Sequence, residues 1–578
     1  MEHNQIYFAN REQTSRFINR WDILLLIIVF CVLFFLSWAS QQMATPYSLG
    51  DPLPISLDPV KLPFYALRTV LRMFIALALS IAFTFVVGAL AAKNRRAEQV
   101  IIPAIDILQS VPVLSFLAIT VAGFIHLFPG SLLGPECASI FVIFTAQVWN
   151  MTFSFYQSLK SVPSDLHEVA SMFQLSAWQR FWKVEVPCTL SGLLWNMMMS
   201  MSASWFFVVV SEAIVVAHQD IRLPGVGSYI ALAIEQRDLQ AVGYAILTMI
   251  VVIFLYDQIL FRPLIAWSEK FKMEPSGEEE YQSWLIDLIR RSRLINHIDI
   301  GWRIFKNGFV NARWLSQRTP TAVKDVDFKR QRQMDWGWNA LMMVLVLTSG
   351  YYLLGYILTA LTVREMLHVF LLGAATGTRV IVLIIISSAL WIPVGVWIGQ
   401  RAQWAQKIQP IIQFFAAFPA NLFYPLFVIA IVRFHLSVEI WVTPLMILGT
   451  QWYILFNVIA GASMIPRDLC LAADNFGVTG WQWWRRLALP GIFPFYITGA
   501  ITAAGGAWNA SIVAESVRWG NTTLTATGLG EYIQSSTLAG NFHALALGTA
   551  MMCIYVLIFN HLIWRPLYRL AQERFNFN

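Results

Sequence analysis

Long apolar blocks constrain the fold of this chain more than any other feature of its sequence. Residues 23–37 and 380–398 are two of the longest. A helix needs about 20 mostly apolar residues to cross the hydrocarbon core of a membrane, and similar blocks recur along most of the chain. Only 13% of its residues are charged, about half the share of a soluble protein. The sequence therefore predicts an all-α integral membrane protein.

The apolar blocks predict about twelve membrane-spanning helices, six in each half of the chain. They cover 22–40, 66–92, 104–127, 136–157, 189–215 and 240–261, and then 337–361, 367–399, 410–432, 438–460, 491–515 and 543–564. The predicted divisions are an N-terminal tail at 1–21, a first half at 22–264, a hydrophilic linker at 265–336 and a second half at 337–578. The linker is either a simple tether or carries an amphipathic helix, near 284–293, on the membrane surface.

Lysine and arginine predict the orientation of these helices. With the N-terminus inside, 31 of the 40 Lys and Arg residues fall in inside segments and six in outside loops; when the fourteen at 262–332 are left out, 17 remain inside against six outside. Cytoplasmic loops of membrane proteins are enriched in these residues. Both termini are therefore predicted to be cytoplasmic. The net charge of +7 is then a consequence of topology, and it gives no reason to expect nucleic-acid binding.

The second half repeats the first at a nearly constant spacing. The early part of each half matches at an offset of 307 residues and the later part at 303. The matched pairs include Arg72/Arg379, Trp178/Trp481, Glu212/Glu515, Gly225/Gly528 and Gly227/Gly530. Because each half has an even number of predicted spans, both repeats face the same way. This predicts two parallel repeats related by an axis along the membrane normal.

Each half has a polar loop between its fourth and fifth predicted spans, at 163–187 and 466–490. A short helix is predicted after the proline that opens each loop, with Asp165 or Asp468 as its N-cap. Under this interpretation Glu168 can be the capping partner of Asp165, three residues earlier. Both loops then carry a Trp-Gln pair and end at a proline.

These loops resemble the Glu-Ala-Ala coupling motif of ABC importer permeases. The Trp-Gln pairs, Pro-Leu-Phe at 425–427 and Leu-Pro-Gly-Val-Gly at 223–227 are similar to the nitrate/sulfonate/taurine/bicarbonate branch, and most of all to its duplicated single-chain anion permeases. The chain departs from the motif at Gln174, where the family has Gly, and at Leu471, where it has an acidic residue. The resemblance implies the type I ABC importer permease fold and assigns ATPase coupling to Asp165, Glu168, Ala170, Trp178, Asp468, Ala473, Gly477 and Trp481.

The chain is not expected to be an enzyme. It has no Gly-Lys dipeptide, so a phosphate-binding loop of the P-loop ATPase type is missing from it. Its histidines and cysteines show no metal-ligand spacing, and no cofactor is expected in this chain. The resemblance implies ATP and Mg on separate ATPase subunits, in two copies. It also implies a periplasmic or lipid-anchored substrate-binding protein and a location in the bacterial inner membrane.

Four charged residues within or beside the predicted spans recur in both halves: Arg72, Arg379, Glu212 and Glu515. Such residues are costly in a membrane and face a partner or a cavity. Each arginine either pairs with the glutamate of its own half or attracts an anion. Ser204 and Asn509 either offer hydrogen bonds to an oxyanion or serve close helix packing. These alternatives stay open at the level of sequence.

The function that these features favour is the permease subunit of an ABC importer for a small anion, with both permease halves fused. The ATPase would dock on the two loops and drive alternating access. Two alternatives remain from the sequence. The first is the fused permease of a ferric-iron ABC importer, which also has two coupling loops. The second is a secondary transporter with two parallel repeats, which would need no docking loops.

Overall fold

The computed structural model describes residues 30, 43, 54–216, 219–268, 307–311, 328–520 and 522–574. The N-terminal tail, nearly all of the predicted span at 22–40 and the predicted amphipathic helix near 284–293 lie outside this part of the chain. The chain separates into two compact units. The first comprises Met1–Gln41, Ser161–Leu194 and Tyr256–Val323, and the second comprises Gln42–Lys160, Trp195–Leu255 and Lys324–Asn578.

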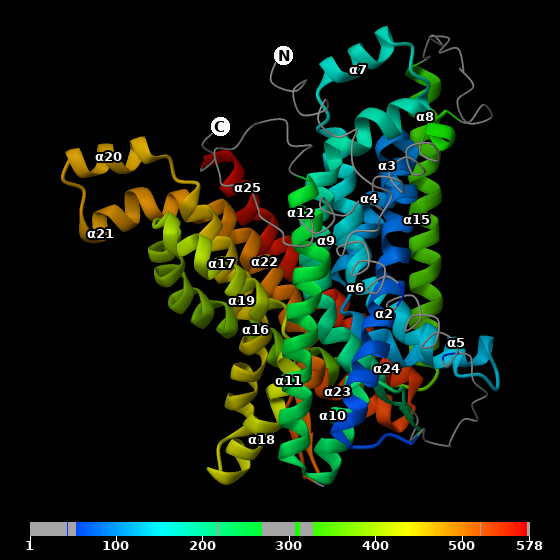
Figure 1. The fold of residues 1–578 in the computed structure, drawn as a ribbon. Helices are drawn as coiled ribbons and strands as arrows, with labels where there is room; N and C mark the ends of the chain where they lie inside the picture. The colour runs from blue at the N-terminus through cyan, green and yellow to red at the C-terminus, as the bar shows by residue number, and fades with distance from the viewer. Residues whose placement is uncertain are drawn as a thin grey trace, which may run out of the picture. The chain divides into compact units, whose positions relative to one another are not determined.

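The described part of the first half is built almost entirely of helices (Figure 1). In order, they are η1 (Pro59–Lys61), α2 (Leu62–Phe83), η2 (Thr84–Gly88), α3 (Ala89–Lys93), α4 (Arg95–Ser110), η3 (Val113–Phe116), α5 (Leu117–Leu127), α6 (Leu133–Lys160), α7 (Ser164–Met172), α8 (Ala177–Arg180), η4 (Phe181–Glu185) and α9 (Val186–Glu212). The hairpin strands β1 (Ala213–Val216) and β2 (Gln219–Arg222) follow. The half ends with α10 (Val226–Gln236), α11 (Leu239–Tyr256), η5 (Asp257–Phe261) and α12 (Arg262–Ser268).

From its second helix onward, the second half largely repeats this order. It begins with α15 (Phe328–Leu358) and α16 (Val363–Gly399), and continues with α17 (Ala402–Ala417), η7 (Ala420–Phe423), α18 (Tyr424–Arg433), α19 (Val438–Ser463), α20 (Arg467–Asn475), α21 (Gly480–Trp483), η8 (Trp484–Ala488) and α22 (Leu489–Ala514). After β3 (Ser516–Trp519) and β4 (Thr522–Thr525) come α23 (Leu529–Ala539), α24 (Phe542–Phe559), η9 (Asn560–Trp564) and α25 (Arg565–Arg574). The sequence offset of 303 residues also relates the starts of α7 and α20, of η4 and η8, and of β1 and β3.

Nine helices within the described residues are long and apolar enough to cross a membrane, and each overlaps one predicted span. The predicted all-α membrane class is confirmed. The predicted span at 410–432 is broken: its two helices are bent by 75° at Pro419, whose backbone is extended. The equivalent span at 104–127 is interrupted at Pro112 in the same way. Proline and the extended backbone around it end an α-helix at these points.

Two small antiparallel hairpins, which the sequence did not predict, follow α9 and α22. Ala213 pairs with Arg222 at the open end of the first, and Ser516 pairs with Thr525 in the second. The predicted span at 189–215 had included the start of the first hairpin. Instead α9 ends at Glu212, and the chain reverses.

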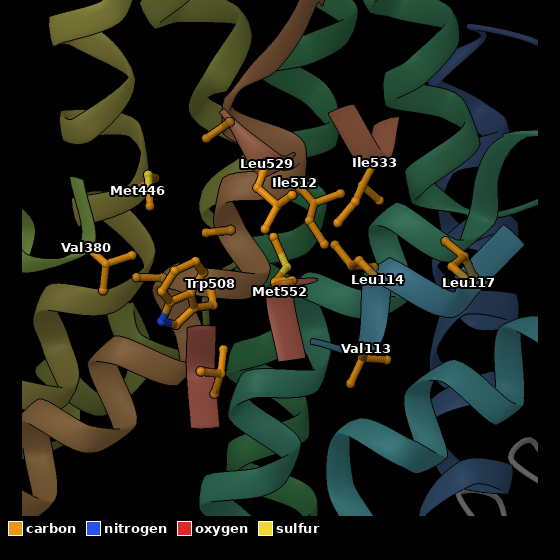
Figure 2. Close-up of a cluster of buried hydrophobic side chains, with 14 of the residues drawn as sticks. Val113, Leu114, Leu117, Val380, Met446, Trp508, Ile512, Leu529, Ile533 and Met552 are labelled. Atoms are coloured by element: carbon orange, nitrogen blue, oxygen red, sulfur yellow. The ribbon is translucent and has the colours of Figure 1, made fainter. Parts of the chain in front are cut away.

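The core of the larger unit contains side chains from both halves of the sequence (Figure 2). Val113, Leu114 and Leu117 of the first half belong to one buried cluster with Trp508 and Met552 of the second. Two hydrogen bonds also join the halves. The Thr549 hydroxyl donates to the Ser115 carbonyl over 3.0 Å, and the amide of Gly520 donates to the Ile234 carbonyl over 2.9 Å. The two repeats therefore share one core.

Candidate functional site

A buried arginine joins three helices of the first half. Arg72 on α2 donates from Nε and Nη2 to the two carboxylate oxygens of Glu136 on α6, over 2.6 and 2.8 Å. Its Nη1 donates to Glu212, the last residue of α9, over 2.6 Å, and its Nη2 also donates to the Pro224 carbonyl over 3.0 Å. Arg72 and Glu212 are completely buried. A two-pronged contact of this kind fixes the geometry of arginine and carboxylate together.

Glu136 also binds a second arginine. Arg68, one turn before Arg72 on α2, donates to Glu136 Oε1 over 2.8 Å, and both side chains are almost completely buried. Two arginines thus face two glutamates, Glu136 and Glu212, so the formal charges of the group cancel. Such cancellation is what buried charges require, because an unpaired charge loses its hydration without compensation. We call Arg68, Arg72, Glu136, Glu212 and Thr69 the first network.

Glu212 also holds the beginning of helix α10. Its Oε2 accepts a hydrogen bond from the Gly227 amide over 2.7 Å. The Thr69 hydroxyl donates to Glu212 Oε1 over 2.6 Å and accepts from the Val226 amide over 3.1 Å. A carboxylate is favourable at a helix N-terminus, where amides are unpaired. Gly225 gives the carboxylate room, because a Cβ there would overlap it; the φ of 179° is open to any residue.

The second half contains an equivalent group, the second network: Arg379, Glu439, Glu515 and Thr376. Arg379 on α16 donates to Glu515 Oε1 over 2.8 Å and also pairs with Glu439 on α19. Thr376 donates to Glu515 over 2.8 Å, and the Gly530 amide donates to Glu515 Oε2 over 2.7 Å. The structure therefore brings each predicted arginine to the glutamate of its own half.

The two networks differ in charge and burial. Ala375 stands where the first network has Arg68, which leaves one arginine between two glutamates. Glu439 compensates by accepting hydrogen bonds of 2.8 Å from both the amide and the hydroxyl of Thr527. Its side chain is 50% exposed, against 2% for Glu136. An exposed carboxylate loses less of its solvation than a buried one, so the second network tolerates its excess negative charge.

Sequence reasoning missed Glu136 and Glu439 as members of these networks. Both stand at the beginning of a predicted span, where an acidic residue is easily assigned to the membrane border. The signal that could have found them is their own repetition, because they match at the same 303-residue offset as Glu212 and Glu515. Arg68 has no charged counterpart in the second half, so the repeat gave no signal for it.

Ser204 and Asn509 form hydrogen bonds within their own helices. The Ser204 hydroxyl donates to the Ser200 carbonyl over 2.7 Å, and the Asn509 amide group donates to the Gly505 carbonyl over 3.2 Å. Serine commonly bonds a carbonyl one turn earlier in this way. Among the described residues, the buried Oδ1 of Asn509 has no hydrogen-bond partner. These two side chains lie on α9 and α22, the helices that end beside the two networks.

The first polar loop consists of α7, a turn and α8. The prediction that Asp165 caps α7 was wrong, and so was the same prediction for Asp468 in α20. In each case the proline is the N-cap residue and no side chain caps the helix. The helix begins at the residue directly after the proline, so the aspartate falls inside the first turn. There it still faces the positive end of the helix.

Each loop combines exposed charge with exposed apolar side chains. Glu168 is exposed on α7 and Ala170 is buried, while Met172 and Phe173 are 82% and 75% exposed. In the second loop Ala473 is half-buried, and Leu471, Phe476 and Trp481 are 60%, 84% and 73% exposed. Clustered apolar side chains on a polar surface are typical of protein interfaces.

The turn after each short helix has the same backbone conformation. Gly477 has a φ of 63°, in the left-handed region that suits glycine. Gln174, at the equivalent position, has a φ of 50°. The departure from glycine at Gln174 has therefore not changed the shape of the turn. Within the described residues, no group of three or more His, Cys, Asp or Glu side chains is placed to hold a metal ion.

This fold and these sites define a multi-pass membrane protein of the transport class. The chain belongs to the family of binding-protein-dependent transport system inner membrane components. The family model matches it twice, over residues 84–262 and 391–572, which together make up more than half of the chain. Each match contains one polar loop and one glutamate–glycine contact, so the two halves are two copies of the family's module.

Three relatives resemble parts of this chain at low identity. The bicarbonate transport system permease protein CmpB of Synechococcus elongatus is 23% identical over 32% of this chain and 60% of its own length. The nitrate import permease protein NrtB of Leptolyngbya laminosa is 29% identical over 20% of this chain and 38% of its own. The glycine betaine/carnitine transport permease protein GbuB of Listeria monocytogenes is 24% identical over 30% and 56%. In each case the chain spans less than two thirds of the relative's length.

Proposed function

We propose that this chain is the permease subunit of an ATP-driven ABC importer for a small anion, with both permease halves in one polypeptide. The observation that carries the proposal is the pair of polar loops, each with exposed apolar side chains at the same place in its repeat. The two matches to the family model support it, as does the similarity to the bicarbonate and nitrate permeases. The anion class is nitrate, sulfonate or taurine, or bicarbonate.

The proposal includes the partners of the chain and its orientation. Two ATPase subunits, which carry ATP and Mg, dock on the two loops, and a periplasmic or lipid-anchored binding protein delivers the anion. The loops and both termini lie on the cytoplasmic side of a bacterial inner membrane, as the distribution of Lys and Arg predicts. Closure of the ATPase pair moves the loops and switches the halves between inward-open and outward-open states.

We further propose that the arginines of both networks hold the fold together and do not bind the anion. The Nε, Nη1 and Nη2 atoms of Arg72 already donate hydrogen bonds to Glu136, Glu212 and the Pro224 carbonyl. It is completely buried. An anion would have to displace a carboxylate that already occupies the bidentate position. Ser204 donates its single hydroxyl hydrogen to the Ser200 carbonyl, which favours close helix packing as the role of this residue. The amide group of Asn509 has two hydrogens and donates to the Gly505 carbonyl, so its other hydrogen can donate to an oxyanion.

Charge reversal on the loops tests the docking. Glu168→Lys and Asp474→Lys each place a positive charge on one loop. In the complex with its ATPase, reconstituted in nanodiscs, both variants are expected to lower substrate-stimulated ATP hydrolysis, and by different factors, because the loops are chemically unequal. Glu573→Lys, an exposed change on α25, is the matched control and should leave the rate unchanged. Identical losses would contradict unequal loops, and unchanged rates in both variants would overturn the docking itself.

A second substrate class has one observation in its favour. GbuB, whose name gives glycine betaine and carnitine, matches a similar share of this chain as CmpB does. Calorimetry on the partner binding protein separates the classes directly. Binding of nitrate, taurine or bicarbonate with no response to glycine betaine supports the anion class. Binding of glycine betaine alone would mean that the substrate is a zwitterion and not an anion. The proposed docking of the ATPase on the loops would not be affected by that result.

A further inference from the structure

A short piece of the linker contacts the first polar loop. Trp178 on α8 donates from its indole nitrogen to the Phe309 carbonyl over 3.1 Å. Gln179, the next residue, donates from Nε2 to the side-chain oxygen of Asn311 over 2.9 Å. The Phe309 ring meets the rings of Trp178 and Trp182 edge to face, with centroids 5.2 and 5.5 Å apart. Edge-to-face aromatic pairs stabilise beyond the area they bury.

The linker contact is connected to the turn of the loop through one side chain. Gln179 belongs to a capping box, in which the Ser176 hydroxyl accepts from the Gln179 amide over 3.2 Å and Gln179 Oε1 accepts from the Ser176 amide over 3.1 Å. Its Nε2 is the atom that donates to Asn311. The linker therefore orients the very amide group that closes the turn between α7 and α8.

The repeat supplies an internal comparison. Trp481 and Gln482 are the equivalents of Trp178 and Gln179, and they could make the same contacts. Trp481 is nevertheless 73% exposed and Gln482 is exposed too. The N-cap of α21, Thr479, makes no side-chain capping hydrogen bond, whereas Ser176 caps α8. Identical Trp-Gln pairs are thus covered in one loop and open in the other.

We propose that residues 307–311 are an intramolecular ligand of the first loop, a linker clamp that stiffens its turn and makes the two loops mechanically unequal. The clamp covers the α8 side of the loop and leaves Met172, the last residue of α7, and the adjoining Phe173 exposed. A partner therefore meets a rigid first loop and a more mobile second loop. The statement about the partner rests on the proposed docking function, but the clamp itself does not.

Hydrogen exchange on the purified full-length chain, without ATPase, tests the clamp. In the wild type, amides of residues 177–182 are expected to exchange more slowly than those of 480–485. The double variant Phe309→Ala/Asn311→Ala removes the Phe309 ring contacts and the Gln179–Asn311 hydrogen bond, and keeps the carbonyl that Trp178 bonds. It should raise exchange at 177–182 by about tenfold, the effect of losing one neutral hydrogen bond together with the ring packing, and leave 480–485 unchanged. Trp178→Phe, which keeps a ring and loses the indole donor, should give a smaller rise.

Two results would overturn the clamp: equal exchange in the two wild-type loops, or no change in the double variant. Trp481→Ala is the matched control in the second loop and should not alter exchange at 177–182. The same variants in the ATPase complex then address the docking function separately. If exchange responds as expected but ATP hydrolysis does not, the clamp stands and the proposed coupling role of the first loop fails.

Discussion

One residue difference explains most of the inequality between the two buried networks. Where the second half has Thr527, the first has Pro224, and proline has no amide hydrogen to give. Glu439 takes the Thr527 amide and hydroxyl as donors. Glu136 has no such donors and instead binds Arg68 in addition to Arg72. Both carboxylates pair with the arginine of their own network; a second arginine stabilises Glu136, and the amide and hydroxyl of a threonine stabilise Glu439.

This difference predicts unequal costs for the same substitution. Glu136→Gln leaves Arg68 and Arg72 buried with a single carboxylate, and breaking a buried ion pair in this way costs about 3–5 kcal/mol. Glu439→Gln changes a half-exposed side chain and should cost less than about 1 kcal/mol. Thermal unfolding of the detergent-purified variants measures both. Equal shifts in Tm would mean that the burial of Glu136 does not determine how much this residue contributes to the stability of the fold.

The sequence identified two of the three arginines and two of the four glutamates, but not how they are connected. Arg72, Arg379, Glu212 and Glu515 stood out because charged residues are rare inside apolar blocks. Their pairing within each half was one of two interpretations. What the sequence could not provide was the backbone acceptor at Pro224 or the amide donor at Gly227, because every residue carries such groups and only the fold selects which of them meet.

The turn after each loop helix is the element in which the two repeats differ most simply. Gln174 occupies a left-handed conformation that costs an ordinary residue about 1–2 kcal/mol, while Gly477 occupies it without that cost. Gln174→Gly is therefore expected to stabilise its loop by about 1 kcal/mol and Gly477→Gln to destabilise the other by a similar amount. Hydrogen exchange of α7 and α20 gives both values. Stability changes of opposite sign in the two variants support this explanation. If Gln174→Gly instead destabilises its loop, contacts of the glutamine side chain stabilise the loop by more than the left-handed conformation destabilises it.

The contact between α4 and α6 predicts a pH dependence. Glu98 on α4 accepts hydrogen bonds from the Tyr156 hydroxyl and from Lys160 on α6. The bond from Tyr156, and then the one from Lys160, lowers the pKa of Glu98 below its usual value. The pKa is lower in the folded than in the unfolded chain. The stabilisation is therefore complete above the unfolded pKa, about 4.3, and is lost as pH falls through the folded value.

A pH series with Glu98→Gln checks this sign. The wild type should be more stable than the variant by a constant amount between pH 7 and 5, and the difference should shrink as the carboxylate is protonated at lower pH. Thermal unfolding at each pH, in one detergent and at fixed ionic strength, provides the comparison. A difference that grows toward acid would contradict the lowered pKa.

Elements were predicted well where periodic apolar residues decide the structure and poorly where tertiary contacts do. Nine predicted spans correspond to continuous helices, because twenty apolar residues in a row leave few other folds. The break at Pro419 was visible as a proline but had been placed inside a span. The hairpin after Glu212 was not predicted, because its first strand is apolar and its sequence looks like a continuation of the preceding helix. The helix stops there when the Glu212 carboxylate turns to the amide of Gly227.

On the scale of the whole molecule, the shared core predicts that the linker is not needed to keep the two halves together. Val113, Leu114 and Leu117 are buried in one cluster with the second half, and Thr549 donates to the Ser115 carbonyl. A protease site inserted between residues 312 and 327 allows the chain to be cut after membrane insertion. Both fragments should then co-elute in size-exclusion chromatography in detergent, because their contacts do not pass through the linker.

The position of the cut also separates the linker's two roles, as a connection and as a clamp. Residues 307–311 remain on the first fragment, so exchange at 177–182 should stay slow after cleavage, as in the uncut chain. An identical chain without the protease site, treated with the same protease, controls for damage elsewhere. Fragments that elute separately would show that the covalent connection holds the repeats together. Fast exchange at 177–182 in co-eluting fragments would show that the clamp needs the covalent connection to the second half. Its own contacts with Trp178 and Gln179 would then not be enough to hold it in place.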